Sequence, residues 1–263
     1  MMFDFLKRRR AGKSTYESAD VMLMHKKMNF AATEAYKLLR TNLTFMLPDT
    51  GKCRIIGVTS SIRSEGKSTT SINLSYTLAE TGKRVLVIDG DLRLPSVAKK
   101  LELSVEEGLS NLLVGMGTKE SLIVRMSELP CWHVLPSGHI PPDPVERLGS
   151  AEMKALIEEL SGDYDFIVID LPPVNIVSDA LAVAELIDGM LVVVRDDYST
   201  RRELHKCIKQ LELSSVRVLG FVVTSLHGER SLYSKYKSRY YRSRYYKHYG
   251  DREADTNEEE SNN

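Results

Sequence analysis

The stretch that decides the fold is RIIGVTSSIRSEGKSTTSINLSYTLA, residues 54–79. It begins with an apolar, β-branched run at 54–60, which predicts a strand covered on both faces. A loop of small and polar residues follows and ends in GKST (66–69), where a helical pattern begins. A strand that leads through such a loop into a helix is the context of a phosphate-binding P-loop.

The loop supplies the groups that a triphosphate such as ATP needs. Backbone N–H groups and the helix N-terminus would cradle phosphate oxygens, Lys67 would bridge the β and γ phosphates, and the Ser68 hydroxyl would bind Mg²⁺. The predicted nucleotide-binding residues are Ser64, Glu65, Gly66, Lys67, Ser68 and Thr69. The usual motif has a Gly five residues before Gly66, where this chain has Ser61, so an ordinary capped strand-to-helix turn is the alternative.

Two acidic motifs follow the loop at the ends of predicted strands. RVLVIDGDLRLP (84–95) ends a strand at Asp89 and places Asp91 two residues later, and YDFIVIDLPPV (164–174) delivers Asp170. Carboxylates at the C-terminal ends of such strands point into the ligand crevice, and Asp170 has the setting of a Walker B residue that holds the Mg²⁺ hydration shell. Taken singly, each Asp is equally well explained as a strand-end or helix-cap residue.

Strand-like and helix-like segments alternate between residues 54 and 224. The predicted strands are 54–60, 84–89, 132–137, 165–170, 189–195 and 217–223, and a helix is expected to start after the capping Ser150 and stop at Gly162. Repetition of strand, helix and strand predicts an α/β fold with a doubly wound, mostly parallel sheet.

The sequence divides into three parts. Residues 1–50 form an N-terminal arm with an amphipathic helix expected at 30–47, residues 51–228 form the α/β domain, and residues 229–263 form a tyrosine-rich tail with an acidic end. From residue 233 onward the tail has no Leu, Ile, Val, Met or Phe, so we expect it to be mobile.

Bulk composition excludes several classes of protein. The 263 residues are 42% hydrophobic and carry no net charge, which fits a domain with a real core and disfavours a general polyanion binder. Three widely spaced cysteines make a disulfide framework or zinc site improbable and fit a reducing cytosol. No apolar run approaches the roughly 18 residues needed to cross a bilayer.

Taken together, these motifs resemble the bacterial tyrosine kinases (BY-kinases) of capsule and exopolysaccharide systems, the CapB/CpsD-like group. The resemblance covers about residues 30–250 and includes EAYKLLRTNL (34–43) and PPDPVERLGS (141–150) as well as the loop and both acidic motifs. It implies a P-loop ATPase fold that uses ATP and Mg²⁺. Lys67, Asp89, Asp91 and Asp170 would be catalytic, with Ser68, Asp91 and Asp170 at the metal and Asp89 accepting or orienting the tyrosine hydroxyl.

The resemblance also gives the tail a function, as the cluster of tyrosines that the kinase autophosphorylates. These tyrosines are Tyr233, Tyr236, Tyr240, Tyr241, Tyr245, Tyr246 and Tyr249. Full modification of all seven would add roughly −10 to −14 charge and turn a basic segment acidic. A docked helix with aromatic packing and a basic-aromatic segment that binds nucleic acid are the two other interpretations, and we expect no nucleic-acid partner.

In the family, an arm motif Glu-x-x-Arg-x-x-Arg lets subunits form a ring, and here it has Glu34, Lys37 and Arg40. Lys37 lacks the bidentate fork of Arg, and spacing alone would favour a solvated helix face. Two further departures affect the nucleotide site: relatives usually have Pro-Gly at the position of Arg63-Ser64, and often Asn at that of Thr224. If Ser64 needs a positive φ, the strain would cost about 1–3 kcal/mol.

The remaining expectations concern partners and setting. The resemblance implies a homo-oligomer, a separate membrane activator protein with a cytoplasmic tail, and a protein tyrosine phosphatase. It implies a cytoplasmic protein that such a partner recruits to the inner face of the membrane, with a role in polysaccharide synthesis. The alternative is a MinD/ParA-like switch or scaffold that hydrolyses ATP without transferring phosphate to tyrosine.

Overall fold

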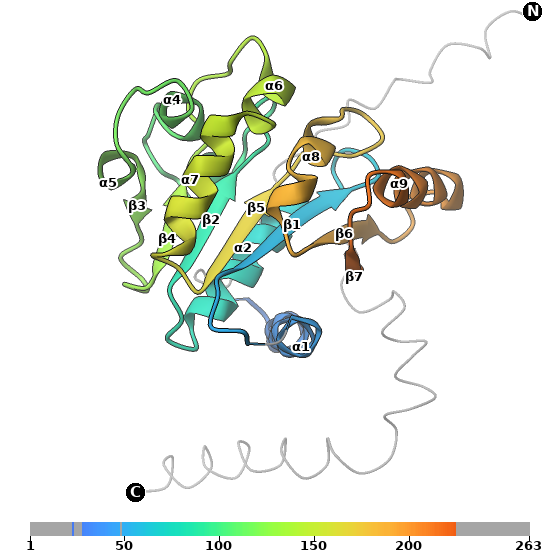
Figure 1. Cartoon of the computed structure of the whole chain (residues 1–263). Helices are drawn as coiled ribbons and strands as arrows, with labels where there is room; N and C mark the ends of the chain where they lie inside the picture. Colours follow the sequence, from blue (N-terminus) through green and yellow to red (C-terminus); the bar gives the residue numbers. More distant parts are fainter. Residues whose placement is uncertain (1–22, 24–27, 48, 225–263) are drawn as a thin grey trace, which may run out of the picture.

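The computed structural model describes residues 23, 28–47 and 49–224. Within them, one seven-stranded sheet has the order β3-β4-β2-β5-β1-β6-β7 (Figure 1). The strands are β1 (Arg54–Ser60), β2 (Val85–Asp89), β3 (Val124–Arg125), β4 (Trp132–Leu135), β5 (Phe166–Asp170), β6 (Gly189–Arg195) and β7 (Val218–Thr224). All neighbours pair in parallel except the short edge strand β3, which is antiparallel to β4.

Helices cover both faces of the sheet, as Figure 1 shows for α7 and α8 on one face and α2 on the other. The helices are α1 (Phe30–Met46), α2 (Lys67–Ala79), α3 (Val97–Lys100), α4 (Leu109–Leu112), α5 (Lys119–Leu122), α6 (Pro144–Leu148), α7 (Ala151–Ser161), α8 (Asp179–Ala182), the 3₁₀ helix η2 (Ala184–Leu186) and α9 (Arg201–Leu213). None of the helices in the described residues is long and apolar enough to span a bilayer.

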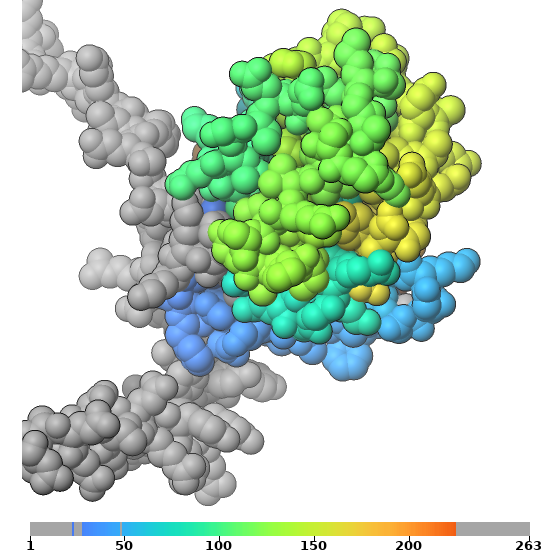
Figure 2. All heavy atoms as spheres, turned by 90° about the vertical axis from the view of Figure 1, so that its left-hand side faces the viewer, coloured from blue at the N-terminus to red at the C-terminus, as the bar shows by residue number. Residues whose placement is uncertain are grey.

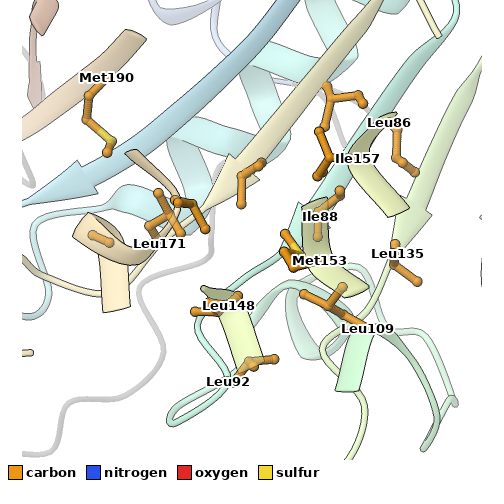
Figure 3. Packing of buried hydrophobic residues seen from close by; sticks show 14 of the residues in the cluster. Leu86, Ile88, Leu92, Leu109, Leu135, Leu148, Met153, Ile157, Leu171 and Met190 are labelled. Atoms are coloured by element: carbon orange, nitrogen blue, oxygen red, sulfur yellow. The ribbon is translucent and has the colours of Figure 1, made fainter. Parts of the chain in front are cut away.

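Successive side chains of each central strand point to opposite faces of the sheet, which divides the core into two layers. Leu86 and Ile88 of β2 pack with Met153 and Ile157 of α7 in one layer, part of which is drawn in Figure 3. The intervening residues of β2, like those of β1 and β5, pack against α2 and α1 in the other layer. Because both faces of the sheet are covered, its central strands are apolar almost throughout, as expected for parallel strands.

The structure confirms the doubly wound sheet. It also confirms the predicted strands, whose ends differ from the observed ends by no more than two residues. The helix after the loop ends at Ala79, and the Ser150 hydroxyl caps α7 by accepting a hydrogen bond from the Met153 N–H at 3.2 Å. The strand β3 and the short helices between β2 and β4 were not predicted. This segment forms much of the green surface in Figure 2, and its elements are too short to show a periodic pattern.

Candidate active site

The carboxyl ends of β1, β2 and β5 meet at one edge of the sheet. Asp89 and Asp170 are direct register partners on β2 and β5, and Asp170 is also opposite Val58 of β1. The P-loop leaves β1 at this edge and enters α2 at Lys67. Long-range strand pairing therefore brings together motifs that lie about a hundred residues apart in the chain.

The loop contains two left-handed backbone conformations. Gly66, at the start of α2, has φ 97°, and Ser64 has φ 63°. Ser64 thus adopts the positive φ considered above, at a cost of about 1–3 kcal/mol for a residue with a Cβ. The Thr224 hydroxyl at the end of β7 donates to the Glu65 carbonyl at 2.7 Å, which ties the last strand to the loop.

The Glu65 side chain is fully buried. Its carboxylate accepts hydrogen bonds from the Ile62 N–H at 2.7 Å, from the Ser61 hydroxyl at 3.0 and 3.1 Å, and from the Ser199 hydroxyl. The serine that replaces the usual glycine is therefore a partner of Glu65. Of Glu65, only the backbone remains available to a phosphate.

A cavity of about 420 Å³ lies beside the loop. Three segments line it: the loop and first turn of α2, the segment between β2 and the end of α3, and residues 172–177 after β5. The predicted site residues that line it are Ser64, Gly66, Lys67, Ser68, Thr69 and Asp91. Asp89 and Asp170 lie beneath this surface, with no exposed area.

Lys67 and Asp91 face each other across the cavity, with 3.9 Å between Nζ and Oδ2. Burial raises the pKa of Asp91, and the Lys67 ammonium opposes that shift. The second oxygen of Asp91 accepts a hydrogen bond from the Leu94 N–H at 3.1 Å. One oxygen of Asp91 is thus held by its own loop, while the other is directed toward the P-loop lysine.

Asp170 offers an unused oxygen next to the cavity. Its Oδ1 accepts a hydrogen bond from the Ser71 hydroxyl at 3.1 Å, whereas its buried Oδ2 has no donor among the described residues. Burial raises the pKa of Asp170, and Lys67 lowers it. An orphaned carboxylate oxygen beside the Ser68 hydroxyl and Asp91 fits Mg²⁺, which prefers oxygen ligands and keeps several waters.

Asp89 is held more tightly than its predicted role suggests. Its Oδ2 accepts hydrogen bonds from the N–H groups of Ser96 and Val97 at 3.0 and 2.9 Å, and its Oδ1 accepts one from the Asp91 N–H at 3.3 Å. Burial and the neighbouring Asp170 charge raise the pKa of Asp89 to about 7. In this structure Asp89 fixes the loop after β2, so its encounter with a tyrosine hydroxyl stays a prediction.

Ser96 is a site residue that was not predicted. Its hydroxyl donates to the Ser68 hydroxyl at 2.7 Å, and its backbone N–H is bound by Asp89. Arg93 is a second, because its Nε donates to the fully buried Asp179 at 2.9 Å beside the cavity. Their position within seven residues of Asp89 and Asp91 was the available signal, but their partners lie elsewhere in the chain.

Comparison with known proteins agrees with this geometry. A family model described as an AAA domain matches residues 53–218. The tyrosine-protein kinase YwqD of Bacillus subtilis (strain 168) is 32% identical over 230 residues, which cover 86% of this chain and 95% of YwqD. The chain belongs to the bacterial tyrosine kinases. The crystal structure of the chimerical protein CapA2B2 is similar, with 31% identity and a TM-score of 0.73 over 79% of this kinase and 90% of that chain.

The fold of the kinase is shared more widely. The septum site-determining protein MinD of Pyrococcus horikoshii OT3, solved in complex with Mg-ADP, is 28% identical, with a TM-score of 0.55 over 65% of this kinase and 70% of that chain. The P-loop and the parallel sheet are thus common to proteins with different activities, and the site itself has to distinguish them.

The arm residues of the kinase lie on α1. Lys37 forms an ion pair with Glu34 at 2.8 Å, and both side chains are more than 40% exposed. Arg40 instead points toward α2, where its Nη1 donates to the Thr77 carbonyl at 2.6 Å. Glu34 and Lys37 are accessible to a second subunit, whereas Arg40 already anchors the arm to its own domain. The tail tyrosines lie outside the described residues.

Proposed function

We propose that this kinase transfers the γ-phosphoryl group of Mg²⁺-bound ATP to tyrosine side chains. The observation that carries the proposal is the convergence of Lys67, Ser68 and Asp91 on one cavity, with the unused Asp170 oxygen beside it. Phosphoryl transfer depends mainly on positioning and on charge stabilisation, which these groups can supply.

Each residue then has a defined task. The backbone N–H groups of residues 64–69 and the Lys67 ammonium bind the phosphates and neutralise their charge. Mg²⁺ would be held by Ser68, Asp91 and Asp170 and would supply further neutralisation of the phosphate charge. Asp89 holds the loop after β2 in place, and in this proposal it would also orient or deprotonate the acceptor hydroxyl.

The proposed acceptors are the seven tyrosines at positions 233–249, modified in trans within an oligomer. Glu34 and Lys37 would contribute to the subunit interface. A membrane activator with a cytoplasmic tail would recruit the kinase to the inner face of the membrane, a phosphatase would reverse the modification, and the pathway would control surface polysaccharide synthesis. These assignments rest on the family resemblance.

Intact-mass measurement tests the activity. The full chain, mixed with a cytoplasmic fragment of the candidate activator, is incubated with ATP and Mg²⁺, and phosphate additions are counted. Lys67→Met should abolish them while the fold is retained, and replacing the seven tail tyrosines by Phe should remove most of them but leave ATP binding intact. Near-normal phosphorylation in a folded Lys67→Met protein would refute the assignment of the P-loop.

The shared fold with MinD supports one second candidate, a nucleotide-operated switch. That candidate predicts ATP hydrolysis without any gain in protein mass. Release of phosphate by wild-type protein whose tyrosines stay unmodified, with the activator fragment present, would favour the switch over the kinase.

A further inference from the structure

Lys100, the last residue of α3, lines the same cavity as Lys67 and Ser68. It reaches the cavity from the segment after β2, which is a different wall from the P-loop. Its neighbour Lys99 is exposed and does not line the cavity. Two adjacent lysines on one short helix thus have different surroundings, and only Lys100 faces the site.

Lys100 carries its charge in an unfavourable environment. It is half-buried, and among residues 23, 28–47 and 49–224 no carboxylate forms an ion pair with it within 4.0 Å. Burial lowers the pKa of Lys100, with Lys67 and Lys99 adding to that effect and Asp170 opposing it. A buried, unpaired ammonium group costs free energy unless an anion compensates it.

Two other cations that line the cavity differ in this respect. Arg93 also lines the cavity, but its guanidinium is paired with the buried Asp179. Lys67 faces Asp91 at 3.9 Å. Lys100 is therefore the cavity-lining cation of this segment whose charge the described residues leave uncompensated, which is the condition expected of a ligand-binding group.

The position along the cavity indicates which anion Lys100 would meet. Lys100 lines the same cavity as Lys67, Ser68 and Asp91, which take Mg²⁺ and the terminal phosphates in the proposed function. Besides the neighbouring Lys99, the charged groups that act on its pKa are Asp170 and Lys67. A triphosphate, which carries more negative charge than a diphosphate, would compensate a cation at this place more fully.

We propose that Lys100 is a second phosphate-binding cation of the kinase, which contacts the terminal phosphate of a nucleoside triphosphate from the segment after β2 rather than from the P-loop. This inference rests on the proposed function. Lys100 forms no covalent bond and moves no proton; it stabilises negative charge on the terminal phosphate and makes the site prefer a triphosphate to a diphosphate.

Calorimetric titration of the full chain tests this, with Mg²⁺ present and with AMP-PNP and ADP as probes, because AMP-PNP separates binding from transfer. Lys100→Met should weaken AMP-PNP binding by roughly tenfold or more, since a charge-assisted contact is worth about 1.5–3 kcal/mol. ADP affinity should change by less than about threefold, which is well under one such contact. Lys100→Arg should retain most of the preference, and the matched control Lys99→Met should bind both nucleotides as wild type does.

The outcomes separate the two proposals. If the wild type binds neither nucleotide, or Lys67→Met binds both normally, the proposed function fails and this inference falls with it. Other outcomes overturn only the role of Lys100, provided that the wild type and Lys67→Met behave as expected. These outcomes are that Lys100→Met binds both nucleotides as wild type does, that it loses affinity for both equally, or that Lys99→Met shows the same change. Lys100→Gln, a neutral side chain of similar length, gives the same comparison should the Met variant misfold.

Discussion

Glu65 is the clearest case in which a side chain organises the site without touching the ligand. A buried carboxylate with four oxygen contacts from three donors, one of them the Ser199 hydroxyl that follows β6, holds the loop from behind. Ser61 and Ser199 therefore belong to the construction of the nucleotide site, although neither lines the cavity.

We predict that Glu65→Ala lowers the free energy of unfolding by about 2–4 kcal/mol, because it leaves the Ile62 N–H and two hydroxyl groups without their acceptor. Ser199→Ala, which removes one donor and leaves the other contacts, should cost about 1 kcal/mol. Urea denaturation of the full chain measures both values. Equal stability of the two variants would mean that Glu65 does not brace the loop as described.

A second prediction at the residue scale concerns His133. Its Nε2 donates to the Pro130 carbonyl at 3.1 Å and its Nδ1 accepts from the Tyr164 hydroxyl at 2.7 Å, an arrangement that needs the neutral ring. Burial lowers the pKa of His133 below 6.5. The unfolded chain therefore binds the proton first, so the stability from this group is present above pH 6.5 and is lost as the pH falls through the lowered folded value.

The His133→Gln variant should lack this loss. We expect the unfolding free energy of the wild type to fall by more than that of the variant from about pH 7 to about pH 5. Urea denaturation at several pH values measures both. A difference that stays constant across this range would show that His133 has the same pKa in the folded and unfolded chain.

At the scale of elements, the segment that follows β4 and the start of α4 are packed together through close backbone contact. Leu109 N–H donates to the Pro136 carbonyl at 2.7 Å and Ser110 N–H donates to the Ser137 carbonyl at 2.8 Å. A Cβ at Gly108 would lie 2.1 Å from the Pro136 carbonyl oxygen, so only glycine fits between the two segments.

We predict that Gly108→Ala destabilises the protein by about 3 kcal/mol or more, because backbone atoms rather than a flexible side chain oppose the new methyl group. Gly115→Ala is a matched control: Gly115 has φ 74° and nothing within 4 Å of an added Cβ, so only the backbone strain of about 1–2 kcal/mol applies. Thermal or urea unfolding distinguishes them, and a smaller loss at Gly108 than at Gly115 would contradict the close contact.

For the whole molecule, α1 presents different residues to its own domain and to the outer surface. Arg40 joins α1 to α2 through the Thr77 carbonyl and lies 4.0 Å from Glu80, while Glu34 and Lys37 pair on the outer surface. If the arm forms an interface between subunits, its outer residues should affect assembly and its inner residue should affect the stability of each subunit.

Replacing Glu34 and Lys37 by Ala should therefore lower the mass seen in light scattering and change unfolding free energy by less than about 1 kcal/mol, because exposed ion pairs contribute little. Arg40→Ala should cost about 1–2 kcal/mol of stability through the lost hydrogen bond to Thr77. A wild type that stays monomeric with ATP and activator present, or an unchanged mass in the double variant, would reject the interface.

The sequence by itself determined the parts of the protein that neighbouring residues encode. The strand at 54–60, the GKST turn and the aspartates at the ends of β2 and β5 follow from local periodicity and strand length, so the P-loop and the place of these aspartates at the sheet edge were predictable. Capping serines and glycines likewise marked the limits of α7, because a helix terminus needs partners within one turn.

Only the tertiary structure decided where the side chains of these motifs point. The Glu65 carboxylate accepts a hydrogen bond from Ser199, which lies 134 residues later in the chain. The Glu65 carbonyl accepts one from Thr224, which lies 159 residues later. Lys99 and Lys100 are the same residue type in sequence, yet one is exposed and the other lines the cavity. The physical reason is that register and helix rotation are set by long-range packing, and a shift of one residue moves a side chain to another face.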